Sequence, residues 1–183
     1  MEIVIEQLQK KDLEEILKFI KEVIKDNFLF ENRPPGNFEE VIDNEMATQR
    51  KRLEESFGSK GIKFLVAKKK DEVVGTIGYY YSGPTILKAQ EVLKQNFHNI
   101  CEIVSVYVKP EYQRQNIGSL LLKNIFESIK SSPYEYFGLS TAYKKGLAFW
   151  RKKFGETTCF LPKYYNDKAD CSVWIGKISE VNL

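Results

Sequence analysis

The spacing of apolar residues changes several times along the chain and predicts alternating strands and helices. Residues 2–8 (EIVIEQL) have the composition and spacing of a short strand. Asp12 with Glu15 three residues later predicts a capping box, which marks the start of a helix. Beyond it, apolar residues recur three and four positions apart, which predicts one buried helical face. These residues are Leu13, Ile16, Leu17, Ile20, Val23 and Ile24.

Proline and glycine indicate where this helix ends and where a second one lies. Residues 26–37 are predicted as a loop, because the Pro-Pro-Gly sequence within them cannot continue a helix. Asn37 with Glu40 repeats the cap signature. The second helix is expected to run to about Phe57 and to end at Gly58.

The rest of the chain predicts a mixed sheet. Two β-rich runs within residues 61–83 flank a polar turn near residues 70–72, which predicts a hairpin. The order β-α-α-β-β-β-α-β-α-β indicates an α/β fold in which helices flank about six to seven strands. A chain of 183 residues fits one domain, 1–183. The later segments are a loop with a helical stretch (83–97), a long strand (99–110), a helix (118–130), a strand (134–142), a short helix (143–155), a possible strand (157–161) and a last strand (170–178).

Composition narrows the classes of protein that fit this pattern. The chain is 43% hydrophobic and 29% charged, and no apolar run approaches the roughly 20 residues that span a bilayer. The first residues lack the basic start and apolar centre of a signal peptide. Three cysteines without a CxxC pair, and a single histidine, argue against a disulfide framework, a metal site or a His-based triad. These features predict a protein of the reducing cytoplasm.

The charge balance gives little reason to expect a nucleic-acid or membrane partner. The net charge is +3, with basic clusters at residues 67–72 and 149–154. These clusters could favour an anionic ligand, but solvated side chains are the simpler interpretation for Lys68, Lys69 and Lys70. Nucleic-acid binding would need a wider basic face with elements that contact bases.

Residues 106–126 (VYVKPEYQRQNIGSLLLKNIF) join a strand to a helix through a polar loop with one glycine. A helix N-terminus leaves about four backbone N–H groups unpaired, and its dipole favours an anion. A loop with small residues such as Gly118 and Ser119 could aim these donors at a diphosphate. Asn116 tolerates a left-handed backbone, and Arg114 adds a positive charge. The alternative is that Gly118 only lets the helix pack tightly on the sheet.

The loop contains neither GxxxxGK[ST] nor GxGxxG, so it is not one of those two phosphate-binding loops. It closely resembles motif A of the GNAT N-acetyltransferases, [QR]-x-x-G-x-[GA] after a strand that ends in V-x-P. Gln113 takes the first place of this motif, Asn116 replaces the first glycine, and Gly118 is the second. The order of predicted elements also resembles that of the family along nearly the whole chain.

The resemblance implies that acetyl-CoA binds at this loop. Backbone groups of Val106 and Val108 would pair with the pantetheine arm, and loop amides would hold the pyrophosphate. In the family the sheet splays after this strand, and the acetyl group would lie near the middle of residues 101–108. The cofactor-binding residues expected from the resemblance are Val106, Tyr107, Val108, Gln113, Arg114, Gln115, Asn116, Ile117, Gly118 and Ser119.

Acetyl transfer to an amine needs a neutral nitrogen. A lysine-type amine has a pKa near about 10.4, so its deprotonation at pH 7 costs about 4 kcal/mol. Glu102 is the candidate general base, because it is a carboxylate within an apolar strand. Burial raises the pKa of a carboxyl group and makes it a better base, and the family often uses a glutamate in an E-I-V context here. The alternative is that Glu102 faces solvent or pairs with a lysine.

The acid that would protonate the departing thiolate is harder to assign. Many family members use a tyrosine in the pattern A-x-x-F-Y-x-K-x-G-F, and residues 147–156 (LAFWRKKFGE) align Arg151 with that tyrosine. Arginine cannot donate a proton at neutral pH. Tyr143 or Tyr164 could substitute, or the thiolate could leave unassisted. The residues of this helix expected in its core are Trp150 and Phe154.

The resemblance places the acceptor pocket at the loop between the first two helices and at the late strands. Aromatic rings and carboxylates there would suit a cationic amine, although three consecutive tyrosines cannot all face one side of a strand. These residues are Tyr79, Tyr80, Tyr81, Tyr164, Tyr165, Glu31, Asp167 and Asp170. The resulting hypothesis is an N-acetyltransferase for a primary amine of a small molecule or peptide, as a monomer or homodimer. A non-catalytic acyl-CoA sensor and an acetyltransferase specific for one protein partner are the alternatives.

Overall fold

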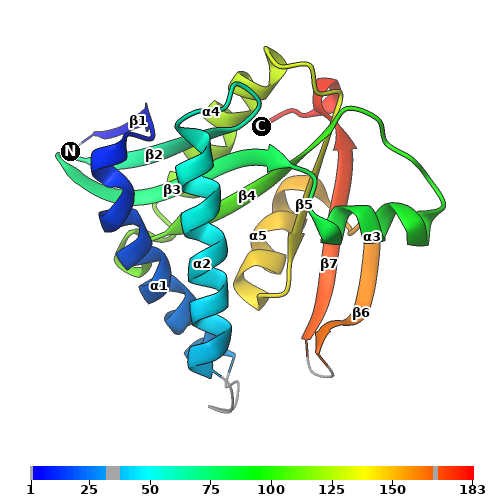
Figure 1. Ribbon diagram of the computed structural model, residues 1–183, viewed down its shortest axis with the longest axis horizontal. Coiled ribbons are helices and arrows are strands. Elements are labelled where there is room, and N and C mark those ends of the chain that lie inside the picture. The colour runs from blue at the N-terminus through cyan, green and yellow to red at the C-terminus, as the bar shows by residue number, and fades with distance from the viewer. Residues whose placement is uncertain (1, 32–37, 167–168) are drawn as a thin grey trace. The chain divides into compact units, whose positions relative to one another are not determined.

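The computed structural model of the chain describes residues 2–31, 38–166 and 169–183 (Figure 1). Its seven strands form one mixed sheet in the order β1-β2-β3-β4-β5-β7-β6. The α/β class and the mixed sheet are therefore confirmed. The elements are β1 (Ile3–Gln7), α1 (Leu13–Phe30), α2 (Phe38–Ser56), β2 (Lys63–Lys69), β3 (Glu72–Tyr81), α3 (Pro84–Leu93), β4 (Ile100–Val108), α4 (Ile117–Lys130), β5 (Tyr136–Thr141), α5 (Lys144–Phe154), β6 (Cys159–Asn166) and β7 (Ala169–Lys177).

The residues group into two compact units. The first comprises residues 1–80 and 104–127, and the second comprises residues 81–103 and 128–183. Strand β4 contributes to both, because its sequence crosses the boundary after Ile103.

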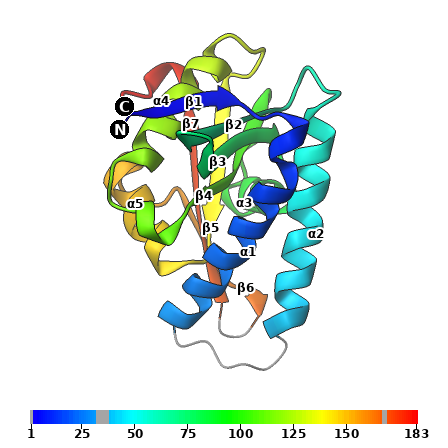
Figure 2. The same cartoon turned by 90° about the vertical axis from the view of Figure 1, so that its left-hand side faces the viewer.

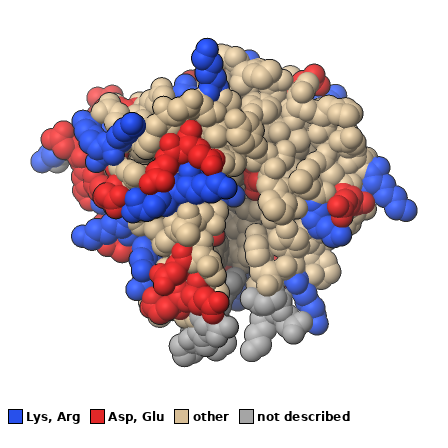
Figure 3. Space-filling model, viewed as in Figure 1, with Lys and Arg blue, Asp and Glu red and all other residues tan. Residues whose placement is uncertain are grey.

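In the first unit, β1, β2 and β3 form an antiparallel ladder, with Ile5 opposite Ala67 and Val66 opposite Thr76. Helices α1 and α2 lie side by side on one face of these strands, and α4 lies on the other (Figures 1 and 2). Oppositely charged side chains are interspersed over α1 and α2 (Figure 3), including the ion pair between Lys21 and Asp43.

Helix α1 is longer than the sequence predicts. It continues to Phe30, although residues 26–37 were expected to form a loop. Asn27 and Phe28 extend the buried face by one turn, and the ring of Phe28 contacts that of Phe38 edge-on, with centroids 4.7 Å apart. The apolar spacing therefore predicts the end of α1 better than the prolines do. Those prolines, and Asn37 of the second cap signature, lie outside the described residues.

The expected capping box at Asp12 and Glu15 is wrong. The backbone N–H of Gln9 donates to Asp12 Oδ2 at 3.2 Å, and Glu15 Oε1 instead accepts a hydrogen bond from the N–H of Val73 on β3 at 2.9 Å. These carboxylates therefore tie α1 to neighbouring segments and do not cap its own first turn.

The expectation that Lys68 is a solvated surface residue is also wrong. Only 6% of Lys68 is exposed, at a bulge in β2, and its ammonium group lies 3.0 Å from Asp12 Oδ1 and 3.3 Å from Glu6 Oε2. Burial opposes the charged form of Lys68, but the hydrogen bonds to Asp12 and Glu6 raise its pKa overall. By contrast, Lys69 is half-buried and Lys70 is exposed.

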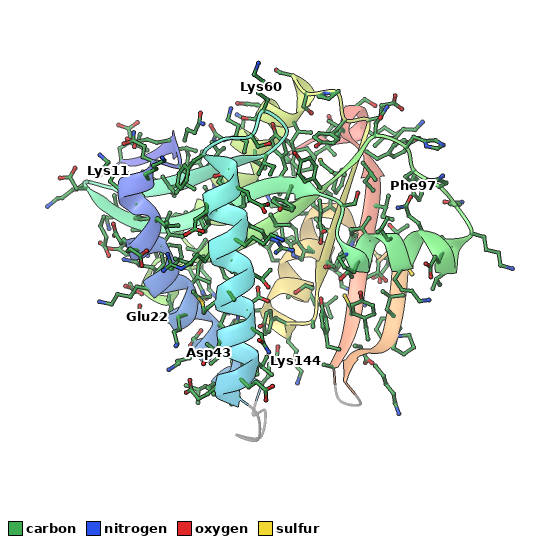
Figure 4. All side chains as sticks on the ribbon, viewed as in Figure 1. Lys11, Glu22, Asp43, Lys60, Phe97 and Lys144 are labelled. Carbon is green, nitrogen blue, oxygen red and sulfur yellow. The ribbon has the colours of Figure 1, made fainter. Side chains whose placement is uncertain are left out.

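In the second unit, β5 pairs antiparallel with β7, which pairs with β6. Helix α3, which begins at Pro84, packs its buried residues Ile86 and Ala89 against the sheet. This helix was expected only as a helical stretch in a loop, and it adds a helix between β3 and β4 to the predicted order. Phe97, which follows α3 (Figure 4), places its ring 5.1 Å from that of Tyr136.

The three cysteines are all buried and none forms a disulfide bond. Burial raises the pKa of the Cys101 thiol to about 12 and that of the Cys171 thiol to about 11, and it also raises the pKa of Cys159. Among the described residues, no group of three or more His, Cys, Asp or Glu side chains could hold a metal ion. None of the helices in the described segments is long and apolar enough to cross a membrane.

Candidate functional site

The loop between β4 and α4 contains two residues with a left-handed backbone, and the sequence indicated this tolerance for Asn116 alone. After a short turn at Pro110–Tyr112, Arg114 and Asn116 adopt left-handed conformations, with φ of 60° and 65°. Asparagine occupies this region more readily than most residues do, so Asn116 can stand where the motif has a glycine. Alternating backbone conformations of this kind can turn successive N–H groups toward a common point.

The side chains of this loop hold its shape. Gln113 Nε2 donates to the carbonyl oxygen of Val108 at 3.0 Å, and Gln115 Nε2 donates to that of Glu111 at 2.9 Å. The first bond of α4 runs from Leu120 N to Asn116 O at 3.0 Å. Helix geometry therefore leaves the N–H groups of the first turn, residues 117–119, without intrahelical acceptors.

The start of α4 lies close to the sheet because β3 has a glycine beneath it. A Cβ atom on Gly75 would lie 3.1 Å from Leu121 Cδ1, 3.1 Å from the carbonyl oxygen of Tyr107, and 3.4 Å from Ile117 Cγ2. Ile117 is only 2% exposed. Tight packing was an alternative expected at Gly118, whereas Gly75 lies in an ordinary strand pattern that does not signal it.

A charged cluster fixes the turn that precedes the loop. Glu72 on β3 accepts hydrogen bonds from Lys109 Nζ at 2.8 Å and from the Tyr112 hydroxyl at 2.9 Å. The bond from Lys109, followed by that from Tyr112, lowers the pKa of Glu72. The ammonium group of Lys69 lies 4.8 Å from the centre of the Tyr112 ring. These contacts join the chain after β4 to the β2–β3 hairpin.

Strand β4 itself contains an irregular residue. Ser105 has a φ of 55° although it lies within the strand and is only 6% exposed. Its hydroxyl group donates a hydrogen bond to Oε1 of Gln49 on α2, a side chain that is 1% exposed. Gln49 was not predicted as a functional residue, although it is a polar residue at helical spacing between the buried Ile42 and Leu53.

In the second unit, Glu102 is buried. It is 6% exposed, and its Oε2 atom accepts a hydrogen bond from the N–H of Gly83 at 2.8 Å. Glu102 is paired with Gly138 in the parallel ladder that joins residues 100–102 of β4 to residues 136–138 of β5. The alternative in which Glu102 faces solvent is therefore wrong.

Cys171 on β7 is a neighbour of Glu102. Burial is the main cause of its raised pKa, and the negative charge of Glu102 adds to the rise. The hydroxyl groups of Tyr165 and Ser140 form hydrogen bonds with this thiol and partly offset the rise. Burial also raises the pKa of Tyr165, whose hydroxyl contacts Thr85 as well. Glu102 and the Tyr165 hydroxyl are thus both neighbours of one buried thiol.

The two tyrosines predicted as acid candidates lie in different surroundings. Half-buried Tyr143 directly precedes α5; its N–H donates to Thr141 Oγ1 at 3.2 Å and its carbonyl accepts from Leu147 at 2.8 Å. Tyr164 packs against the apolar cluster of α3, β6 and β7, and its ring lies 4.9 Å from that of Tyr165.

Of the two residues of α5 expected in the core, Trp150 is buried and Phe154 is half-buried. Trp150 is 5% exposed and stacks on Phe154 with ring centres 6.0 Å apart. Arg151, which aligns with the motif tyrosine, is exposed and lies 3.5 Å from Glu156 Oε2.

The aromatic residues predicted near the acceptor do not share one orientation. Tyr79 is 5% exposed, Tyr80 donates a hydrogen bond from its hydroxyl to Glu55 on α2, and Tyr81 is 52% exposed. Asp170 Oδ1 accepts a hydrogen bond from the N–H of Lys163 at 2.8 Å. Of the first acceptor segment, residues 26–36, Glu31 is half-buried after the end of α1, and residues 32–36 lie outside the described residues, as does Asp167.

Residues 17–155 match the sequence model of the Acetyltransferase (GNAT) family. No curated protein matches the chain by sequence. Solved structures resemble the chain over almost its whole length, at identities that establish the fold alone.

Three of these structures illustrate the likeness. The PaiA N-acetyltransferase from Thermoplasma acidophilum, solved with coenzyme A, has a TM-score of 0.68 and 20% identity over 95% of this chain and 99% of that chain. The yncA protein from Salmonella typhimurium, solved with acetyl-CoA, has a TM-score of 0.66 and 16% identity over 100% and 98%. An aminoglycoside 6'-acetyltransferase type Ii has a TM-score of 0.64 and 14% identity over 96% and 97%.

Proposed function

The chain belongs to the GNAT acetyltransferase family, and from this premise we propose that it transfers the acetyl group of acetyl-CoA to a primary amine of a small molecule or peptide. The observation that carries the proposal is the left-handed backbone of Asn116 at the start of α4. This loop can present the N–H groups of residues 114–119 to a pyrophosphate at the positive end of the helix dipole, whereas the N–H of Gln113 already donates to the carbonyl oxygen of Pro110 at 3.2 Å. Two of the similar structures hold coenzyme A or acetyl-CoA.

Strand β4 has backbone groups suited to the pantetheine arm. In the part of the chain that the structure describes, the ladder with β5 uses β4 only up to Glu102. Val106 and Val108 lie beyond that ladder, so their backbone groups are candidates to pair with the pantetheine amides as an added strand would. The carbonyl of Val108 already accepts one bond from Gln113, and its second lone pair can accept another.

In the proposed reaction the amine nitrogen attacks the thioester carbonyl carbon, and the C–S bond breaks. Glu102 takes a proton from the amine, directly or through water, and coenzyme A leaves as the thiolate or thiol. The burial of Glu102 and its hydrogen bond from the N–H of Gly83 support this assignment, because both restrict the carboxylate to one position. The whole of residues 1–183 would act as one acetyltransferase domain.

For the acid, Tyr143 and Tyr164 remain candidates, and Tyr165 joins them. The Tyr165 hydroxyl contacts Cys171, which also neighbours Glu102. A tyrosine hydroxyl is protonated at neutral pH, since its ordinary pKa is about 10, so Tyr165 has a proton to donate. A thiolate that leaves unassisted would need none of the three.

The proposal predicts both binding and turnover. Acetyl-CoA at 100 times its Kd should stabilise the folded chain by about 2.7 kcal/mol in a melting experiment. Thiol release should appear with one class among polyamines, aminoglycosides, amino acids, and lysine or N-terminal peptides. Stabilisation without turnover on any free amine would favour a sensor, which the exposed Arg151 at the motif position also favours, or an enzyme for one protein. If acetyl-CoA causes no stabilisation and no amine causes thiol release, the proposal is overturned.

Asn116 tests the role of the loop conformation. Asn116→Gly is expected to keep or improve acetyl-CoA affinity, because glycine adopts positive φ without strain. Asn116→Val should weaken it at least about tenfold, because a β-branched residue strongly disfavours this conformation. Isothermal titration with acetyl-CoA gives the Kd of each variant. Equal affinity in the glycine and valine variants would contradict the proposed loop.

A further inference from the structure

A closed set of hydrogen bonds joins the buried face of α2 to β4 within the first unit. Gln49 Oε1 accepts a hydrogen bond from the Ser105 hydroxyl. Gln49 Nε2 donates to Glu45 Oε1 at 2.7 Å and to the Tyr107 hydroxyl at 3.5 Å, and this hydroxyl in turn donates to Glu45 Oε1 at 3.3 Å. A glutamine amide offers one oxygen and two N–H groups, and Gln49 uses the oxygen and the nitrogen of its amide in this set.

These bonds hold a strained residue. A serine with a φ of 55° occupies a sparsely populated region of backbone space, which persists only where the surroundings impose it. Ser105 lies between Val104 and Val106, where the chain is otherwise extended. Its hydroxyl bond to Gln49 is a contact that would restrain this conformation, because Gln49 is itself fixed on α2 by Glu45 and Tyr107.

We propose that Gln49 is a positioning residue for acetyl transfer, which acts through Ser105 to hold the backbone of β4 at the point where the acetyl group is placed. The inference rests on the proposed function and on the position of the acetyl group, near the middle of residues 101–108, that the family resemblance implies. A left-handed residue turns the adjacent peptide groups away from the directions of a regular strand. Those groups are then fixed for contact with the thioester, and fixed donors cost no reorganisation during reaction.

The test is a rescue experiment. Gln49→Leu is expected to lower kcat at least about tenfold with the KM for acetyl-CoA changed less than about twofold, since a misplacement of about 1 Å can cost up to about 100-fold. Ser105→Gly alone should lower kcat less than Gln49→Leu does, because glycine adopts positive φ without strain when the hydroxyl bond is absent. The Gln49→Leu/Ser105→Gly double variant should therefore regain most of the lost kcat.

A merely structural role of Gln49 predicts a different result. Loss of core stability would lower the melting temperature of Gln49→Leu, and Ser105→Gly would not restore activity. The matched control is Thr48→Ala, a neighbour on the exposed side of α2 whose hydroxyl donates to the carbonyl oxygen of Asn44 at 3.0 Å. It should leave kcat unchanged. An unchanged kcat in Gln49→Leu, or a loss without rescue, would overturn the proposal.

A binding measurement separates this inference from the proposed function. The difference in thermal shift between acetyl-CoA and coenzyme A reports the contact made by the acetyl group alone. Gln49→Leu should reduce this difference while keeping the shift with coenzyme A, and the double variant should restore it. If the parent chain binds acetyl-CoA without turnover, the transferase proposal fails. The difference in thermal shift between the two ligands would still show whether Gln49 positions the backbone that contacts the acetyl group. Equal shifts for both ligands in the parent chain would refute that role.

Discussion

Glu102→Gln is expected to lower kcat at neutral pH by about 100-fold or more, in line with the contribution of a positioned general base. Glutamine keeps the size of the side chain, and its amide oxygen can still accept the hydrogen bond from Gly83 that Glu102 accepts at 2.8 Å. What the substitution removes is the ability to take a proton from the amine. The expected change is therefore in catalysis and not in folding or cofactor binding.

The measurement is kcat and KM by thiol release, together with the thermal shift caused by acetyl-CoA. The thermal shift that acetyl-CoA causes in Glu102→Gln should match the shift in the parent chain. Glu127→Gln is a suitable control, because Glu127 is exposed on α4 and stands outside the proposed site. Recovery of activity by Glu102→Gln at alkaline pH would fit a base that deprotonates the amine, since an alkaline solution supplies the neutral amine itself. Full turnover of Glu102→Gln at pH 7 would remove Glu102 from the mechanism.

Asp12→Ala is expected to cost about 3 kcal/mol of folding free energy, because it removes one partner of a buried ion pair. Asp12 is 5% exposed and Lys68 is 6% exposed, with their charged groups 3.0 Å apart. The variant leaves the ammonium group of Lys68 with Glu6 alone, and it also removes the acceptor for the Gln9 N–H. Urea unfolding measures the change through the midpoint at constant m-value.

Two further variants decide whether the ion pair is the cause. Asp43→Ala removes a carboxylate side chain that is 69% exposed and breaks its ion pair with Lys21. This change should cost less than about 1 kcal/mol. Asp12→Leu with Lys68→Met replaces both charges by apolar groups and should recover much of the stability. A loss in Asp12→Ala no larger than that in Asp43→Ala would show that burial does not strengthen the pair.

The ion pair also has a defined pH dependence. The pKa of Lys68 is raised in the folded chain relative to its usual value. Its stabilising contribution is therefore fully present below the unfolded pKa and is lost as the pH rises through the folded pKa. The contribution of Lys68 is thus expected to be constant near neutral pH and to fall in strongly alkaline solution.

Much of the fold follows from the sequence because apolar periodicity reports burial directly. The pattern from Leu13 to Ile24 predicts the buried face of α1, and the residues after Asn116 predict α4. The length of α1 was underestimated because the prolines that follow it were given too much weight, whereas burial of Phe28 continues the helix. Charged residues were judged by type alone, so the buried position of Lys68 was not predicted.

The candidate site is predictable to the extent that it is local in sequence. The left-handed Asn116 could be predicted because the motif and the conformational preference of asparagine lie within one loop. The roles of Gln49 and Gly75 could not be predicted, since they depend on which residues of distant segments face them. Gln49 had one available signal, a polar side chain on the apolar face of α2, which often indicates a specific buried partner.

The burial of all three cysteines has a practical consequence for work on the chain. Alkylating reagents, disulfide reagents and peroxide react with thiolates that they can reach. Cys101 and Cys171, with pKa values of about 12 and about 11, are almost entirely protonated at neutral pH, and Cys159 is shifted in the same direction. Colorimetric reagents that count free coenzyme A should therefore register little signal from the native polypeptide. The same reagents would report unfolding, because denaturation exposes all three sulfur atoms to solvent.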